Sequence, residues 1–294
     1  MPAGDISTVR LATRGSALAR RQALLAAAAL RAVGAAGIDT VIVRTEGDRR
    51  LDTAIEQLEG QGWFTAELER SLLDDRADVA VHSAKDLPSA LAPGLAVAAY
   101  LTRADPRDGV VSAGNRPLAA LPAGARIGTS SARRAGLLRA LYPDLRVVPM
   151  RGNVDTRLRK LDSGEVDALV LACAGLDRLE HGDRCCERLD PATFVPSPAQ
   201  GAIALETAVG SGAAALCARA GDAGTTTAVT AERAVLAGLG GGCLLPLGAW
   251  ARMEDGILRL SAALVVDGVV RRAEASDRPE RAIALGEAVA AKLR

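Results

Sequence analysis

Two pieces of the sequence occur twice in the same order, and this repeat limits the possible folds more than any other feature. VRLAT (9–13) is a short β-type run followed by a helical segment that ends near Gly34. ARIGT (125–129) is followed in the same way by a helical segment that ends before Pro143. The two strand-to-helix junctions, LATRGSA and IGTSSAR, contain similar residue types. The repeat predicts two regions that each contain a strand, a turn and a helix.

A second matching pair lies further along each of these regions. LLDDRADVAVHS (72–83) and LDSGEVDALVLA (161–172) both run from an acidic helix end into a β-branched strand. When one gap is allowed, Asp78 and Asp167 occupy the same position. Two matching pairs in the same order favour two α/β domains of related build.

Segments rich in proline and charge divide the chain further. TRADPRDG (102–109) and FVPSPAQG (194–201) are typical of crossings between domains. After them the pattern changes to a helix, TAERAVLAGL, then to alternating strands around an Asp-Gly turn and a terminal helix, which predicts a smaller α+β domain. The expected domains are residues 1–101 with 201–220, residues 102–200, and residues 221–294.

The composition is that of a folded protein and favours neither a membrane nor a nucleic-acid partner. Of the 294 residues, 49% are hydrophobic and 24% are charged. No stretch approaches the roughly 20 apolar residues of a membrane span. The N-terminus lacks the basic and apolar regions of a secretion signal, so we expect a cytoplasmic protein. The net charge of +1 and the small number of aromatic residues provide little for nucleic acid to bind.

The five cysteines favour neither a disulfide framework nor a metal site, because their number is odd and none lies in a C-x-x-C pair. Cys185 and Cys186 are adjacent, but neighbours in sequence rarely bridge, so we expect all five to be reduced. Cys243 has the most unusual context, LGGGCLLP. Three glycines in a row suggest an unusual turn or a backbone that another group must approach closely. The alternative is a small buried thiol in a loop.

Both strand-to-helix junctions carry side chains suited to an anion. Backbone N–H groups and the helix dipole point at the same place there. Serine or threonine at such positions is more often simply a helix N-cap. Arginine binds a carboxylate with two parallel hydrogen bonds, so a group of arginines is able to hold several carboxylates of one ligand, although a solvated basic face is the alternative. The candidates are Arg14, Ser16, Thr129, Ser130, Ser131, Arg133, Arg134, Arg151 and Arg157.

The stretch VHSAKDLPS (81–89) places several polar groups on one turn at the end of a strand. Lys85 and Asp86 are adjacent, and a plain ion pair between them is one interpretation. The other is that Asp86 holds a developing cation or passes a proton, while Lys85 binds acid groups and tunes the carboxylate. His82 stands in an apolar strand and is expected to be a hydrogen-bonded structural residue.

Eight motifs in order resemble the porphobilinogen deaminase (hydroxymethylbilane synthase) family. They extend from about residue 8 to residue 250 and are LATRGSALA, VHSAKDLP, ADPRDG, IGTSSARR, RGNVDTRL, PAQGA, TAERA and GGCLLPLG. Each motif is weak alone, but the order of all eight is highly specific. The resemblance implies two periplasmic-binding-protein-like (type II) α/β domains with a smaller C-terminal α+β domain, in a monomer.

The resemblance also implies a reaction and a cofactor. The family is a group of transferases that join four porphobilinogen molecules head to tail with loss of ammonia. Hydrolysis then gives 1-hydroxymethylbilane for tetrapyrrole (haem) biosynthesis. Its dipyrromethane cofactor is held by a thioether to the cysteine of the GGC loop, here Cys243. Asp86 matches the family's catalytic aspartate, which would stabilise pyrrole N–H groups as positive charge develops and would assist proton transfers.

Other positions match the binding residues of the family. The expected cofactor-binding residues, besides Cys243, are Ser83, Lys85, Thr129, Ser131, Arg133, Arg134 and Arg157. The expected substrate-binding residues are Arg14, Ser16, Phe64, Arg151, Gln200 and Gly201.

One departure from the family pattern concerns the stretch IEQLEGQGWFTAEL, where many members carry lysines and this chain has Gln57, Glu59 and Gln61. We expect weaker carboxylate binding there. Two other functions remain as alternatives: a non-catalytic anion-binding protein of the periplasmic-binding type, and an inactive relative of the deaminases. The retention of Asp86 and Cys243 argues against the second.

Overall fold

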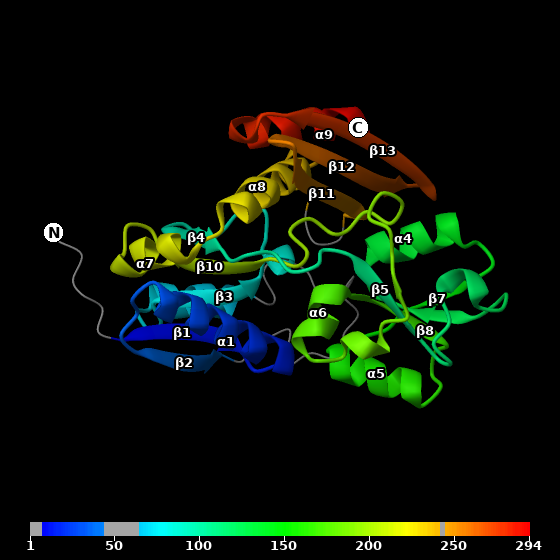
Figure 1. The fold of residues 1–294 in the computed structure, drawn as a ribbon, viewed down its shortest axis with the longest axis horizontal. Helices are drawn as coiled ribbons and strands as arrows, with labels where there is room; N and C mark the ends of the chain where they lie inside the picture. Colours follow the sequence, from blue (N-terminus) through cyan, green and yellow to red (C-terminus); the bar gives the residue numbers. More distant parts are fainter. Residues whose placement is uncertain (1–7, 44–64, 242–244) are drawn as a thin grey trace. The chain divides into compact units, whose positions relative to one another are not determined.

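The computed structural model describes residues 8–43, 65–241 and 245–294, which contain three β-sheets (Figure 1). The contacts divide the chain into two compact units. Unit 1 consists of Met1–Arg103 and Ala202–Thr226, and unit 2 of Ala104–Gly201 and Thr227–Arg294.

The sheet of unit 1 has the strand order β2-β1-β3-β10-β4. β1 (Val9–Arg14) pairs in parallel with β2 (Ile38–Val43) and with β3 (Val79–Ser83). β10 (Ile203–Ala208) is antiparallel to both β3 and β4 (Leu95–Tyr100). A strand from late in the sequence therefore lies between two early strands.

Helices cover both faces of this sheet. The side chains of β1 alternate, so Leu11 packs with α1 (Ala17–Ala32) and α7 (Gly212–Ala220) on one face. Ala12 packs with α3 (Ala66–Leu73) on the other face. The 3-10 helix η2 (Ala84–Asp86) follows β3 directly.

The first sheet of unit 2 repeats this arrangement, with the strand order β7-β6-β8-β5-β9. β6 (Arg126–Gly128) is parallel to β7 (Arg146–Val148) and to β8 (Ala168–Ala172). β5 (Asp108–Ser112) is antiparallel to β8 and to β9 (Glu187–Arg188). The expected pair of related α/β folds is confirmed.

The helices of this part of unit 2 also lie on two faces of the sheet. α4 (Ala132–Leu141) packs on one face, and α5 (Val154–Asp162) and α6 (Cys173–Arg178) pack on the other. Two 3-10 helices, η3 (Leu118–Ala120) and η4 (Gly182–Arg184), lie in the connections.

The third sheet is an antiparallel meander, as the alternating pattern predicts. It contains β11 (Leu247–Glu254), β12 (Ile257–Val266) and β13 (Val269–Asp277). Its Asp-Gly turn at Asp267 has positive φ at both residues, which suits a tight hairpin. The helices beside it are α8 (Ala223–Gly238) and α9 (Ala282–Leu293), the latter after η5 (Pro279–Arg281).

The smaller α+β part belongs to unit 2 by its contacts. An added Cβ atom at Gly136 of α4 would lie 2.9 Å from the side chain of Val265 in β12, so the two elements touch closely. The division into three domains at the expected boundaries stays a prediction.

One arginine–aspartate contact occurs at matching positions of the two α/β sheets. In unit 1, Asp78 Oδ2 accepts hydrogen bonds from the backbone N–H of Arg10 at 2.7 Å and from its Nε at 3.1 Å. In unit 2, Asp167 Oδ2 accepts from the backbone N–H of Arg126 at 2.7 Å and from its Nε at 3.1 Å. The prediction that the two aspartates occupy the same position is confirmed.

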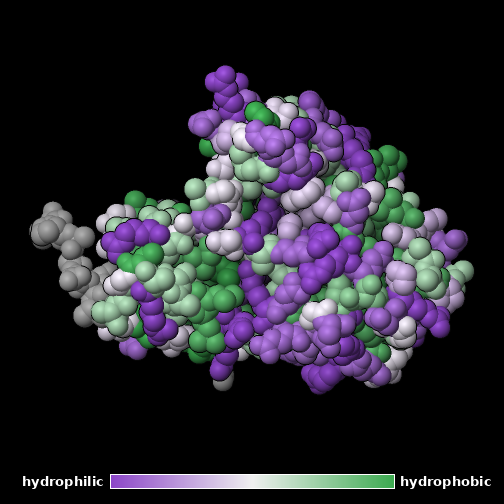
Figure 2. Space-filling view, in the orientation of Figure 1, coloured by the Kyte–Doolittle hydropathy of each residue, from purple (hydrophilic) through white to green (hydrophobic). Residues whose placement is uncertain are grey.

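The exposed surface mixes hydrophilic and hydrophobic residues. Large exposed hydrophobic side chains, such as Leu24, Leu73, Val209 and Val269, come from both units. Figure 2 shows green areas bordered by purple ones on the visible face. Within the described ranges, no helix has both the length and the apolar character needed to cross a membrane.

Candidate active site

A pocket in unit 1 collects side chains from β1, α1, β3 and η2. Four of the residues predicted from the sequence line it: Arg14, Ser16, Ser83 and Asp86. The remaining lining residues are Leu18, Ala19, Gln22, Thr65, Leu68, Val81 and His82.

Local structure explains how three of the polar residues reach this pocket. Ser16 is the N-cap of α1, and its Oγ accepts a hydrogen bond from Ala19 N at 3.3 Å. Gln22 is buried further along α1 and donates from Nε2 to Ser83 Oγ at 2.8 Å. Asp86 ends the 3-10 helix that follows β3 and is half-buried, as is its neighbour Lys85. The tight turn after β3 therefore brings the Asp86 carboxylate into the same pocket as the N-terminus of α1.

His82 has a buried carboxylate partner that no local sequence pattern predicts, because it lies 124 positions away. Its Nε2 lies 2.9 Å from Glu206 Oε2, and both side chains are almost completely buried. The hydrogen-bonded histidine is confirmed, although its ring also lines the pocket. Glu69 of α3 lies nearby, and burial, followed by the charge of Glu206, raises the pKa of Glu69.

The second strand-to-helix junction lies in unit 2 at the start of α4. Ser131 is the N-cap, and its Oγ accepts a hydrogen bond from the backbone N of Arg134 at 3.4 Å. Thr129 is buried, and its Oγ1 accepts a hydrogen bond from Ser131 N at 3.2 Å. Ser130 Oγ donates to Met150 O at 2.5 Å. The N-cap role is thus realised by Ser131, as it is by Ser16 in unit 1.

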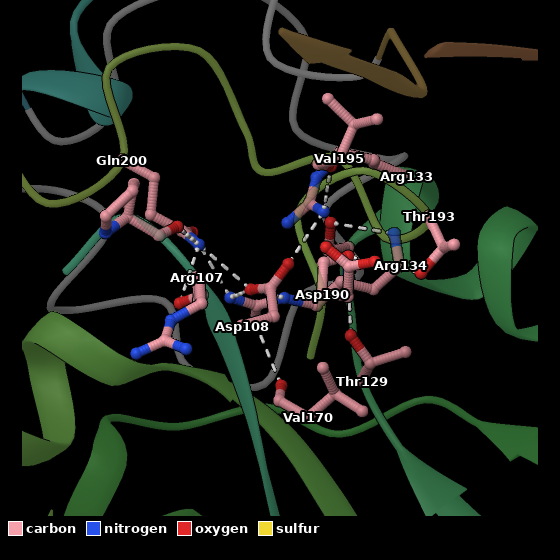
Figure 3. A network of polar contacts seen from close by, with 12 residues as sticks. Arg107, Asp108, Thr129, Arg133, Arg134, Val170, Asp190, Thr193, Val195 and Gln200 are labelled. Atoms are coloured by element: carbon pink, nitrogen blue, oxygen red, sulfur yellow. Dashed lines mark hydrogen bonds and ion pairs between the residues drawn. The ribbon is translucent and has the colours of Figure 1, made fainter. Parts of the chain in front are cut away.

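Arg133 and Arg134 converge on one buried carboxylate, that of Asp108 at the start of β5 (Figure 3). Arg133 Nη1 donates to Asp108 Oδ2 at 2.7 Å and to Val195 O at 2.8 Å. Arg134 donates to Asp108 Oδ1 from Nε at 2.9 Å and from Nη2 at 2.7 Å, and from Nη1 to Val170 O at 3.0 Å. All three side chains are buried.

This cluster has one more positive charge than negative charge. Burial raises the pKa of Asp108, but Arg133 and Arg134 outweigh it and hold that pKa well below its usual range. Burial lowers the pKa of Arg133, and Asp108 opposes this only in part. Arg133 Nε is buried without a hydrogen-bond partner among the described residues. The Arg133 Nε donor and the net positive charge of the cluster both favour the binding of a ligand carboxylate.

Gln200 and Gly201 connect the same cluster to the crossing that precedes β5. Gln200 Nε2 donates to Asp108 Oδ1 at 3.0 Å and to Pro106 O at 2.8 Å. Gly201 has φ of +91°, and an added Cβ atom would lie 2.5 Å from Ala104 O, so only glycine fits there. Both residues therefore have a structural role in addition to any contact with substrate.

The remaining predicted residues are less closely grouped. Arg151 and Arg157 are half-buried around the start of α5, where Arg157 Nε donates to Gly152 O at 2.8 Å. Phe64 and Cys243 lie outside the described residues, as do Gln57, Glu59 and Gln61. Within residues 8–43, 65–241 and 245–294, no cluster of three or more side chains suited to a metal ion occurs.

Two α/β folds that present arginine and serine side chains at strand-to-helix junctions define a protein suited to a small anionic ligand. Comparison with known families makes this specific. Residues 9–215 match the family model described as porphobilinogen deaminase, dipyromethane cofactor binding domain, and residues 226–294 match porphobilinogen deaminase, C-terminal domain. The chain belongs to the porphobilinogen deaminase family.

Relatives match over nearly the whole chain. A porphobilinogen deaminase of Acidothermus cellulolyticus is 44% identical, covering 99% of this chain and 90% of the relative. One of Chromobacterium violaceum is 45% identical, covering 96% and 93%. Among solved structures, the periplasmic VFT2 domain of Bordetella pertussis BvgS is similar at a TM-score of 0.43 and 18% identity, covering 74% of this chain and 87% of that chain. That likeness is too distant to support any conclusion on activity.

Proposed function

We propose that this chain is a hydroxymethylbilane synthase, a transferase that condenses four porphobilinogen molecules with loss of ammonia and then releases 1-hydroxymethylbilane by hydrolysis. The observation that carries the proposal is the presence of Asp86 in one pocket with Arg14, Ser16 and Ser83, in a chain that matches the deaminase family from residue 9 to 294 with one short gap. We also propose that it acts as a cytoplasmic monomer with three domains.

The described residues fit a dipyrromethane cofactor. Such a group carries several carboxylates, and Arg133 offers a buried Nε donor within a cluster of net positive charge. Ser83, Lys85, Thr129, Ser131, Arg134 and Arg157 are the other side chains proposed to hold it, and Cys243 is proposed to attach it. When bound, the cofactor supplies the nucleophilic pyrrole carbon to which the first substrate is joined.

Asp86 is proposed to act on the substrate through its carboxylate. Loss of ammonia from porphobilinogen leaves an electron-poor ring whose pyrrole nitrogen carries positive charge. A carboxylate that accepts a hydrogen bond from that N–H stabilises the charge, and it is placed to accept or return a proton. Asp86 is half-buried, which strengthens this interaction compared with open water.

Arginines of both units are proposed to bind the acetate and propionate groups of the substrate. Arg14 lines the same pocket as Asp86 and is the candidate for orienting the first ring. Arg151 follows β7 and precedes α5, close in sequence to Arg157. Phe64, Gln200 and Gly201 complete the proposed set. Each condensation adds two carboxylates, so the basic stretch between residues 126 and 160 suits a product of growing negative charge.

Intact mass is the experiment that tests this function. The purified protein is compared with Cys243→Ser, and both are treated with an acid aldehyde reagent that colours pyrroles. A mass excess of two linked pyrrole units in the wild type alone supports the proposal, provided that porphobilinogen is also consumed. A bare mass that persists after incubation with porphobilinogen, without product, favours the non-catalytic anion-binding protein instead.

A further inference from the structure

The sulfur atoms of Cys173 and Cys185 lie close together beside a glycine of the five-stranded sheet of unit 2. Cys173 begins α6, directly after β8, and Cys185 precedes β9. Gly109 lies on β5, between β8 and β9. A Cβ atom at Gly109 would lie 2.6 Å from Cys185 Sγ and 3.0 Å from Cys173 Sγ. Both sulfurs are therefore within 3.0 Å of a single point, and the missing side chain of Gly109 provides the space for them.

The neighbouring Cys186 points to the other face of the sheet. Cys185 packs with the cluster that contains Val111, whereas Cys186 packs with the cluster that contains Val110. Because successive residues of a strand face opposite sides, these two clusters lie on opposite faces. Cys186 Sγ donates to Arg116 O at 3.1 Å. The two adjacent cysteines are thus separated, and Cys185 has its thiol partner twelve positions earlier in the chain.

The two thiols differ in charge and in access. A hydrogen bond from Cys173 lowers the pKa of Cys185 to about 7. Burial opposes this shift, and the positive charge of Arg188 adds to it. The same contact, together with burial, raises the pKa of Cys173 well above its usual range. Cys185 is half-buried and Cys173 is fully buried. Arg188 is fixed by ion pairs to Asp105 at 2.6 Å and to Asp177 at 2.7 Å. Cys185 is therefore the more nucleophilic sulfur at neutral pH.

We propose that Cys173 and Cys185 form an oxidation site that peroxide converts to a disulfide. The Cys185 thiolate attacks hydrogen peroxide, the O–O bond breaks, and Cys185 becomes a sulfenic acid. The hydroxide that leaves takes up the proton that the Cys185 thiol lost on ionisation and forms the first water molecule. The sulfur of Cys173 then attacks the sulfur of Cys185, the S–O bond breaks, and the displaced hydroxide takes the proton of Cys173 to form water. In sum, two thiols and one hydrogen peroxide give one disulfide and two water molecules.

The bridge would connect the β8–α6 junction to the segment that leads into β9. These segments flank Gly109, and Asp105 in the preceding crossing is held by Arg188 next to the site. Oxidation is therefore expected to link the segments that follow β8 and precede β9, on the two sides of β5 within unit 2.

The test treats the protein with hydrogen peroxide, alkylates the remaining thiols, and maps the peptides by mass spectrometry. We expect the mass to fall by two hydrogen atoms, a peptide pair joined through Cys173 and Cys185, and full reversal by dithiothreitol. Cys217 is buried and burial raises its pKa to about 12, so it should remain a thiol. The experiment is run on the purified protein and on Cys243→Ser, so its outcome does not depend on cofactor attachment or on the proposed function.

Two variants make the test specific. Cys186→Ser is the matched control and should still form the bridge. Cys173→Ser should not form it, and should instead accumulate a sulfenic acid at Cys185 that dimedone traps. The proposal is overturned by a bridge between Cys185 and Cys186, by preferential oxidation of Cys186, or by survival of both thiols under conditions that oxidise free glutathione.

Discussion

The two α/β sheets have the same strand arrangement but differ at the turn that follows β3 in unit 1 and β8 in unit 2. Both hold an aspartate against an arginine, Asp78 in unit 1 and Asp167 in unit 2. Counted from these aspartates, Asp86 in unit 1 corresponds to Gly175 in unit 2. The turn in unit 1 carries polar groups into a pocket, whereas the turn in unit 2 starts the buried helix α6. The repeated strand arrangement is therefore common to both units, whereas the polar turn that lines a pocket occurs in unit 1.

Buried charge is also placed differently in the two sheets. In unit 1 it is the pair of His82 and Glu206 on neighbouring strands β3 and β10. In unit 2 it is Asp108 on β5, which lies beside Ala172 of β8 and faces the arginines of α4. The position that corresponds to Asp108 in unit 1 is Ile203, which is apolar. Among the described residues, the helix that follows the strand-to-helix junction therefore carries buried arginines in unit 2 (α4) but not in unit 1 (α1).

The largest effect on activity is expected when the turn after β3 in unit 1 loses the carboxylate of Asp86. Asp86→Asn keeps the shape of the side chain but removes its charge and its ability to accept a proton. We expect kcat for porphobilinogen consumption to fall by roughly 10²- to 10⁴-fold. The control is Asp144→Asn, an exposed residue of unit 2. If both variants kept wild-type kcat, Asp86 would not be catalytic.

The next largest effect concerns the buried cluster of unit 2. Asp108→Asn leaves two buried guanidinium groups without their counter-charge, which is expected to lower the free energy of unfolding by about 3–5 kcal/mol. Urea titration of the apoprotein measures this change. Asp39→Asn, at an exposed position of unit 1, is the control. A loss below about 1 kcal/mol would mean that the arginines do not depend on Asp108.

A smaller effect is expected from making unit 2 resemble unit 1 at the position of Gly109. The corresponding residue in unit 1 is Ala204, because Gly109 pairs with Leu171 and Ala204 with His82. Gly109→Ala places a methyl group against both sulfurs and should lower the free energy of unfolding by about 1–3 kcal/mol.

A second substitution separates this steric effect from a general loss of stability. Cys185→Ala removes the sulfur that is closest to the new methyl group. In the Gly109→Ala background it should recover part of the lost stability, which is measured by urea titration of the four proteins of the cycle. Strictly additive losses would contradict the proposed crowding.

The repeated arginine–aspartate contact should make stability depend on acid pH in both units. For Asp78, burial raises the pKa but hydrogen bonds from Arg10 outweigh it, and for Asp167 the hydrogen bond from Arg126 leads, so both values are lowered. A lowered pKa means that the unfolded chain binds more protons near pH 4. The contribution is present above the unfolded value of about 3.9 and is lost as the pH falls toward the folded value.

The measurement is urea unfolding between pH 7 and pH 3. The free energy of unfolding should fall less steeply with decreasing pH in Asp78→Asn and in Asp167→Asn than in the wild type. The stability lost at pH 7 should be larger for Asp78, because its side chain is 18% exposed compared with 41% for Asp167. An unchanged pH slope in both variants would show that neither contact titrates.

Local patterns of sequence predicted the repeated parts of this structure, but they did not predict the contacts that make the two units different. The matching junctions, the serine N-caps and the alternating strands around Asp267-Gly268 are all set by neighbouring residues. In contrast, His82 and Glu206 are 124 positions apart, and Asp108 meets Gln200 across 92 positions. Such pairs leave no local signal, since only the sheet topology brings their strands together. The contact between Cys173 and Cys185 has no local signal either, since it depends on β5 lying between β8 and β9.

The smallest effect concerns how positive charge is divided between the two units. Unit 2 contains the basic stretch from residue 126 to 160, whereas the sequence of unit 1 has Gln57, Glu59 and Gln61 where the family resemblance leads us to expect lysine. If carboxylate binding in unit 1 is limited by this lack of charge, Gln61→Lys should lower KM for porphobilinogen about two- to five-fold, since one exposed ion pair contributes roughly 0.2–1 kcal/mol. The gain should disappear at high salt, and Gln61→Met, which adds length without charge, should leave KM unchanged. Equal effects of lysine and methionine would assign the change to packing, and no effect of either would mean that unit 2 supplies the charge that holds the substrate.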